Sequence, residues 1–342
     1  MSALLTAFTP IWILTAVGYG VGRGGLLGPG AEAVLGRFVF HVAMPAALFT
    51  MVSGARPGAF ANPSMAAFAA GTALVCGLGF QLTGRLFGRG RADRAIGGMV
   101  SGYVNSANLG IPVAVQVLGD ASFVAQIILF QVLLVSPVIL TLLDSGTRAG
   151  GGTGAGAIGT GTGAGTGAES GMRGQRSVAL RRMLTMPVRN PVILASLLGL
   201  AVSTLGLRLP RALAHSCELL GSAAVPTALV ALGLSLHTRP AAGIPAGRSG
   251  PVRAEVVVTV ALKTVLQPLI AFAVGGPLLG LPEPQLLAVV LCSALPTAQN
   301  AFIYAQQYGL DTRVARDAVV ASTVVSMATL SLATWAVGAF GT

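Results

Sequence analysis

The chain has 342 residues, of which 54% are hydrophobic and only 9% are charged, and its mean hydropathy is +0.79. Soluble domains carry about a quarter charged residues, so this composition excludes a globular cytosolic protein and indicates an all-α integral membrane protein. The net charge of +11 comes from arginines in short loops between apolar segments, which favours a role in membrane topology and argues against nucleic-acid binding.

Apolar segments long enough to span a bilayer recur along the whole chain. The first begins near residue 4 without the basic region of a signal peptide, so we expect it to be a retained helix. Ten spans are predicted, approximately at residues 4–22, 33–53, 64–84, 95–118, 122–143, 190–206, 212–236, 254–276, 285–307 and 318–339.

One long polar segment, residues 144–189, separates the fifth predicted span from the sixth. Its middle, residues 149–171, is a low-complexity tract of Gly, Thr and Ala, which is typical of a flexible linker. The basic stretch RSVALRRMLTMPVR that follows is mildly amphipathic and suits the membrane surface. We expect this segment to join two halves of the protein.

Loop arginines predict the orientation in the membrane, because basic loops stay in the cytoplasm. With the N-terminus outside, only Arg56, Arg208 and Arg211 fall in outside loops. The inside loops then hold Arg23, Arg37, Arg85, Arg89, Arg91, Arg94, Arg148, Arg173, Arg176, Arg181, Arg182, Arg189, Arg239, Arg248, Arg253, Arg313 and Arg316. Both termini are therefore predicted outside and the linker is predicted cytoplasmic.

Two predicted spans contain helix-breaking sequences. The fourth carries NSANLGIPVA (105–114), in which Pro112 lacks the N–H that the carbonyl of Asn108 would need in a helix. The ninth carries LPTAQNAFIYAQQYG (295–309). Irregular backbone at membrane depth is tolerated where it lines a cavity or is buried in protein, and two interrupted spans in corresponding places indicate the binding site of a carrier.

The two halves of the chain follow the same plan. Pro45 and Pro112 are 67 residues apart, and Pro226 and Pro296 are 70 residues apart. Each half, residues 1–143 and residues 190–342, has five predicted spans with a proline in the second and a break in the fourth. Because five is odd, the second half enters the membrane inverted, which predicts an inverted repeat.

The motifs FVFHVAMPAALF, NSANLGIPVA, RNPVILASLLGL, AVPTALVALGLSL and LPTAQNAFIYAQQYG together resemble the auxin efflux carrier family in its bacterial form, which includes malonate-type permeases. The resemblance implies ten transmembrane helices as two inverted five-helix repeats with crossed broken helices 4 and 9, similar to bile-acid carriers and sodium/proton antiporters. It also implies a scaffold (spans 1, 2, 6, 7) that can form a homodimer, a transport domain (spans 3–5, 8–10) that moves like an elevator, and a bacterial cytoplasmic membrane location.

The family pattern places the substrate site at Asn105, Asn108, Gly110, Pro112, Pro296, Gln299 and Asn300. Broken helices have N-termini with free N–H groups, and these favour an anion such as a carboxylate. Carboxamides add donors without a buried charge. We therefore expect a secondary transporter of a small organic anion, with Asn108 and Asn300 as the nearest donors. Each amide alone could instead be interhelical glue, and each proline a simple kink.

Lys263 and Glu218 are ionisable residues within predicted spans, which makes both candidates for coupling or gating. A pairing between them would join the transport domain to the scaffold in one elevator state only. The alternative is that each side chain snorkels to the nearer membrane surface. The sequence leaves the coupling ion open between H⁺, Na⁺ and none.

Other functional classes fit less well. No GxSG, HExxH or paired aspartate lies inside a predicted span, so we expect no enzyme, and the dispersed cysteines Cys76, Cys217 and Cys292 indicate no metal site or cofactor. An anion-conducting channel and a sodium-coupled symporter of the bile-acid type remain alternatives, because selectivity filters also use irregular backbone.

Overall fold

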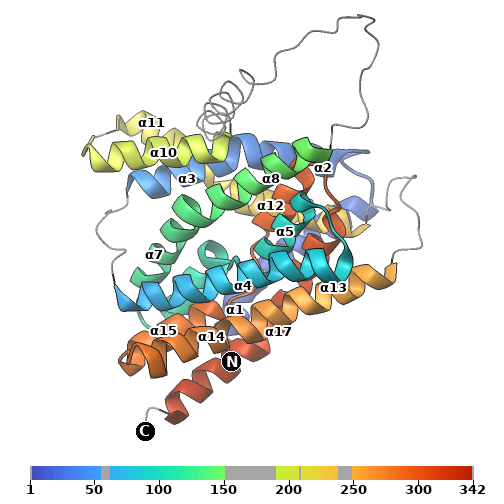
Figure 1. Cartoon of the computed structure of the whole chain (residues 1–342). Helices are drawn as coiled ribbons and strands as arrows, with labels where there is room; N and C mark the ends of the chain where they lie inside the picture. Colours follow the sequence, from blue (N-terminus) through green and yellow to red (C-terminus); the bar gives the residue numbers. More distant parts are fainter. Residues whose placement is uncertain (1, 55–61, 151–189, 208, 238–248, 341–342) are drawn as a thin grey trace, which may run out of the picture.

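The computed structural model describes residues 2–54, 62–150, 190–207, 209–237 and 249–340 (Figure 1). The regular secondary structure of these residues is helical, apart from one isolated β-bridge between Val104 and Thr297. Most of the Gly/Thr-rich tract and the basic stretch after it lie outside the described residues, so their predicted roles stay predictions.

Six helices of the described residues are long and apolar enough to cross a membrane, which confirms an integral membrane protein of the all-helical class. They are Ala31–Ser53, Pro63–Phe87, Ser122–Gly146, Arg211–His237, Val252–Leu278 and Thr312–Leu332. Shorter apolar helices cover Ser106–Val115, Pro191–Thr204 and Glu283–Ser293. The arrangement of ten spans as an inverted repeat stays a prediction.

In chain order, helices interrupted by π-type turns (η) occupy the predicted segments. The first part of the chain holds α1 (Ser2–Arg23), α2 (Ala31–Phe38), η1 (Val39–Ala43), α3 (Met44–Ser53), α4 (Pro63–Phe87), α5 (Arg91–Gly102), η3 (Ser106–Gly110), α6 (Ile111–Val117), α7 (Ser122–Phe130), η4 (Gln131–Val135) and α8 (Ser136–Gly150). The rest holds α10 (Pro191–Thr204), α11 (Arg211–Ser222), α12 (Ala224–His237), α13 (Ser249–Ala261), η7 (Leu262–Leu266), α14 (Gln267–Ala273), η8 (Val274–Leu278), α15 (Glu283–Ser293), α16 (Asn300–Gln307) and α17 (Thr312–Phe340).

Local sequence explains where several of these helices begin and end. The Asn62 side chain accepts from the Met65 N–H at 2.7 Å, which caps the first turn of α4. Gly88, with φ of 62°, ends the same helix in the left-handed conformation that glycine adopts without strain. Asn190 caps α10 in the same way, through the N–H of Val192.

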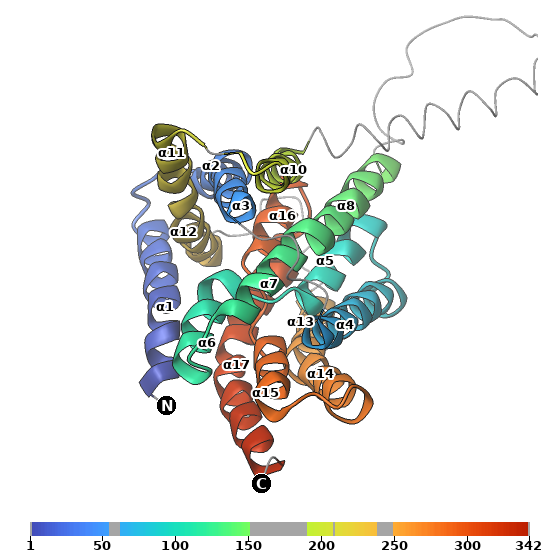
Figure 2. The same cartoon turned by 90° about the vertical axis from the view of Figure 1, so that its left-hand side faces the viewer.

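One group of helices consists of α1, α2, α3, α10, α11 and α12. Helix α1 packs along α12, and α3 packs between α10 and α11 (Figure 2). The backbones of α1 and α12 approach so closely that a Cβ on Gly233 would collide with the carbonyl oxygen of Thr15. Small residues at helix interfaces allow this close packing in membranes.

A second group consists of α4, α5, α8 and α13–α17. Helix α4 packs against α5, α14 and α15, and α5 packs against α8. Helix α17 packs against α13, α15 and α16. In Figure 2, α4, α14, α15 and α17 lie on the side away from α2, α3, α10 and α11, whereas α16 lies next to the first group. The division into a scaffold and a transport domain that the resemblance implies stays a prediction. Helix α6, which follows the first interruption, packs against α1 of the first group.

Candidate functional site

Both helix interruptions are present, and each is a short extended stretch between two helices. Helix α5 ends at Gly102 and helical structure resumes at Ser106. Helix α15 ends at Ser293 and helical structure resumes at Asn300. Each break therefore leaves the carbonyl groups that end one helix and the N–H groups that begin the next without their usual partners.

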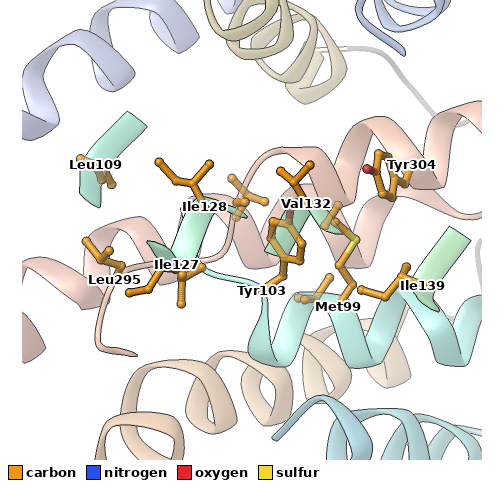
Figure 3. Packing of buried hydrophobic residues seen from close by; sticks show 14 of the residues in the cluster. Met99, Tyr103, Leu109, Ile127, Ile128, Val132, Ile139, Leu295 and Tyr304 are labelled. Carbon is orange, nitrogen blue, oxygen red and sulfur yellow. The ribbon is translucent and has the colours of Figure 1, made fainter. Parts of the chain in front are cut away.

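The two breaks contact each other through their backbones. The N–H of Asn105 donates to the carbonyl of Pro296 at 2.8 Å, and the N–H of Ala298 donates to the carbonyl of Tyr103 at 3.2 Å. Val104 and Thr297 form the antiparallel bridge between these two bonds. Figure 3 shows the buried side chains around this crossing, with Tyr103 beside residues of α7 and η4.

Polar side chains from other helices satisfy the rest of the exposed backbone. Gln131 accepts from the Val104 N–H at 2.8 Å, donates to the Val104 carbonyl at 3.1 Å, and also bonds the hydroxyl of Ser106. Ser322 of α17 accepts from the Thr297 N–H at 3.1 Å. Sequence reasoning missed Gln131 and Ser322. A glutamine in the middle of a predicted membrane span was the available signal for Gln131, which the structure buries.

The first break lies at residues 103–105, before Pro112, so the proline does not create it. Pro112 is in the first turn of α6, where a missing N–H costs little. The π-type turn η3 precedes it, and the N–H of Gly110 bonds the carbonyl of Asn105. The sequence predicted that the helix is interrupted at the Asn108 carbonyl. In the structure the interruption lies several residues earlier, at residues 103–105.

A cavity of about 110 Å³ borders the crossing. Four of its amides, Asn105, Asn108, Gln299 and Asn300, are residues that the sequence predicted for the site. Gln299 is 3% exposed, and its Oε1 has no hydrogen-bond partner among the described residues. A buried carbonyl oxygen without a partner is costly unless water or a ligand meets it.

Both pairs of predicted amides lie at the start of the helix that follows a break. The first pair precedes Pro112 in the sequence, whereas the second pair follows Pro296. Asn105 and Asn108 lie at the start of the helix that resumes after the first break, and Gln299 and Asn300 at the start of α16. The N–H groups of a first helical turn have no partner within the helix. The starts of two helices and five carboxamides, the four predicted ones and Gln131, therefore meet at one cavity.

The opposite wall of the cavity belongs to the first helix group and is apolar. Its residues are Met44, Ala47, Leu48, Met51, Ala224 and Val225, from α3 and α12. Tyr103 also lines the cavity, and its hydroxyl bonds Ser136 at 2.9 Å and the side chain of Asn300. None of the described residues lining the cavity carries a formal charge.

The remaining predicted site residues support the crossing without lining the cavity. Pro296 contributes its carbonyl to the bond from Asn105. Gly110 packs where a Cβ would lie 3.0 Å from a methyl of Val124 and 3.1 Å from one of Leu295. Pro112 is in the first turn of α6, after η3.

Lys263 and Glu218 are not partners in this structure. Lys263 is fully buried in η7, where its Nζ donates to the Gln267 Oε1 at 2.7 Å and the Ser293 carbonyl at 2.9 Å. Glu218 is exposed on α11, 3.8 Å from the ring of His215. Snorkelling of Lys263 is therefore not seen, and the coupling or gating role of the two residues stays a prediction.

A separate ionic cluster joins three elements of the second helix group at the ends of α4 and α16. Arg89 donates to Glu255 of α13 at 2.8 and 2.9 Å and lies 3.8 Å from Asp311. Burial acts to lower the pKa of Arg89, but the hydrogen bond and charge of Glu255 outweigh it and raise the pKa. Among the described residues, no group of His, Cys, Asp and Glu could hold a metal ion.

Comparison with known proteins identifies relatives along almost the whole chain. Residues 3–150 and 169–334 match the family described as Membrane transport protein. A protein of Rhizobium meliloti (strain 1021) named "Putative malonate transporter" is 26% identical over 342 residues, covering 97% of this chain and 95% of the relative. The protein of Escherichia coli (strain K12) named "Uncharacterized transporter YfdV" is 24% identical over 330 residues, covering 94% of each chain.

The family match covers both helix interruptions and the segments packed around them. It agrees with the family that the sequence motifs resemble, and it points to transport and away from catalysis. This chain belongs to the Membrane transport protein family, that is, the auxin efflux carriers.

Proposed function

We propose that this protein is a secondary transporter that carries a small organic anion, a mono- or dicarboxylate, across the bacterial cytoplasmic membrane. The observation that carries the proposal is the cavity at the crossing of the two breaks, with its five carboxamides and the unpartnered Oε1 of Gln299. A relative named "Putative malonate transporter" supports the same substrate class.

The recognition chemistry follows from the cavity lining. The carboxylate of the substrate accepts from the side-chain amides of Asn108 and Asn300, at the start of the two resumed helices. A protonated carboxyl or hydroxyl on the same substrate donates to the Oε1 of Gln299. Because the cavity volume is about 110 Å³, well below that of drug-sized sites, the substrate is a short acid.

The transport step is a movement of the second helix group along the first. In support, the amides and the broken backbone face an apolar wall of α3 and α12, which offers the amides no side-chain hydrogen bond that sliding would break. The two halves, residues 1–143 and 190–342, form the inverted repeat, with residues 144–189 in the cytoplasm and both termini outside. The scaffold helices form a homodimer.

The test is uptake of [¹⁴C]malonate and a panel of labelled monocarboxylates into proteoliposomes, with and without sodium and pH gradients. The proposal predicts saturable uptake that unlabelled substrate inside the vesicles accelerates by exchange. A channel gives no such acceleration, and a sodium-coupled symporter needs the sodium gradient.

Variants connect the flux to the site. Asn108→Ala and Gln299→Ala each raise KM by about tenfold or more, because each removes one hydrogen bond to the charged or polar end of the substrate. Ser216→Ala is the matched control, since Ser216 is exposed on α11 and bonds only its own helix. Wild-type KM in both site variants would remove the cavity from the transport path.

A further inference from the structure

A second polar site lies on the α13–α14 side of the crossing, outside the cavity lining. Lys263, the only lysine in the chain, is fully buried there. None of the described carboxylates lies within ion-pair distance of its Nζ. A buried ammonium without a counter-ion needs another source of negative potential.

That potential comes from the carbonyl ends of the two interrupted helices. The Ser293 carbonyl would pair with the Thr297 N–H in a continuous helix, but that N–H bonds Ser322, so Nζ of Lys263 takes its place at 2.9 Å. The C-terminus of a helix carries a partial negative charge, which favours a cation.

Gln267 extends the same network to the other break. Its Oε1 accepts from Lys263 at 2.7 Å, and its Nε2 donates to the carbonyl of Gly102 at 3.0 Å. Gly102 is the last residue of α5, and the N–H of Ser106 that would meet its carbonyl in a continuous helix bonds Val104 instead. One ammonium and one carboxamide therefore join the C-termini of α5 and α15.

In carriers with broken helices, the freed carbonyls and the C-terminal helix ends are the groups that coordinate a coupling cation. We propose that the Lys263 ammonium is the resident cation of this crossing, in the place that a sodium ion would otherwise take, and that transport is therefore independent of sodium. The inference deepens the proposed function and rests on it for its transport consequence.

The position of Lys263 also has a charge consequence. It lies between α13 and α14, within the second helix group, so it travels with the site. A bound monoanion is then balanced by a charge that belongs to the protein, and the loaded group crosses the membrane without a second ion. Without bound substrate, the second helix group returns across the membrane with the positive charge of Lys263 unbalanced.

The first experiment measures thermal unfolding of the purified full-length protein in detergent, in NaCl against choline chloride at equal ionic strength. The wild-type Tm is expected to be the same in both salts. Lys263→Met removes the donor that the oxygens of Ser293 and Gln267 accept from, which leaves them free to bind a sodium ion. The Tm of this variant is therefore expected to be lower in choline chloride and to rise saturably with NaCl. Arg253→Met, which removes an exposed cation from α13, is the matched control and behaves as wild type.

Two outcomes overturn the proposal: a wild-type Tm that rises saturably with sodium, or Lys263→Met as stable as wild type in choline chloride with no response to sodium. If Lys263→Met yields no folded protein, the wild-type comparison decides alone, since a resident sodium site would show there.

The second experiment measures [¹⁴C]malonate uptake in proteoliposomes. Wild-type uptake is expected to be equal in sodium and choline, and Lys263→Met uptake in choline is expected to fall at least about tenfold. Sodium-dependent wild-type uptake overturns the proposal. If the wild type moves no malonate or other acid, the proposed function fails, whereas the unfolding experiment still tests Lys263 by itself.

Discussion

The N–H of Asn105 donates to the carbonyl of Pro296 across 2.8 Å, although one residue belongs to the first half of the chain and the other to the second. This bond joins the two places where helices are interrupted. Each break supplies the backbone partner that the other lacks, so neither is tolerable at membrane depth without the other. Asn105 and Gln299, each the residue before a resumed helix, line the cavity beside this joint.

The support of the first break by Gln131 is testable. Gln131→Met leaves the N–H of Val104 buried without its partner, at a cost of about 1–3 kcal/mol, while the Val104 carbonyl keeps the bond from the Ser106 N–H. We expect a Tm several degrees lower in detergent and reduced uptake. Thr141→Val is the control, because Thr141 bonds only the Pro137 carbonyl of its own helix. An unchanged Tm for Gln131→Met would show that water replaces the amide.

The close packing at Gly110 predicts a graded effect of side-chain size. The backbone at Gly110 is ordinary right-handed helix, with φ of −60°, so only space limits substitution. An alanine Cβ meets methyl groups of Val124 and Leu295 that can shift by tenths of an ångström, whereas valine cannot be accommodated without moving α6. Uptake should be near wild type for Gly110→Ala and strongly reduced for Gly110→Val. Equal uptake by the two variants would contradict this packing.

Relative motion of the two helix groups can be tested with cross-links. Gln306 of α16 donates to Glu32 of α2 at 3.1 Å, which joins the groups. A disulfide between Glu32→Cys and Gln306→Cys should stop uptake, and a reductant should restore it. Asn62→Cys with Gln126→Cys is the control pair, since it links α4 to α7 across a 2.7 Å bond away from the first group. Full uptake by the cross-linked 32–306 pair would rule out an elevator.

Asp311 of the ionic cluster predicts an acid-dependent loss of its own contribution to stability. Burial acts to raise the pKa of Asp311, but hydrogen bonds from the side chain and backbone of Arg313 outweigh it, so the pKa is lowered. A carboxylate whose pKa is lower when folded stabilises the protein above its unfolded pKa of about 3.9, and this stability disappears as the pH falls through the folded pKa. Wild-type Tm should therefore fall below about pH 4 more steeply than that of Asp311→Asn. Parallel Tm curves for the two proteins would contradict this contribution.

The amino-acid sequence by itself determined the class of protein, the positions of the apolar helices and four of the residues that line the cavity at the crossing. These properties are local. Long apolar stretches must be helical in lipid, and carboxamides and prolines inside such a stretch mark an interruption. Asn105, Asn108, Gln299 and Asn300 could be named for that reason, and so could the family.

Only the tertiary structure decided where the helices are interrupted and which groups bond the backbone at each interruption. The first interruption lies at residues 103–105 because the backbone of the second break, Gln131 and Ser106 offer partners there, and Pro112 fits the helix that follows. Likewise, Lys263 meets Ser293 and not Glu218. Such pairings join residues far apart in the chain, and hydropathy and spacing describe a residue's depth in the membrane but not the neighbour it faces there.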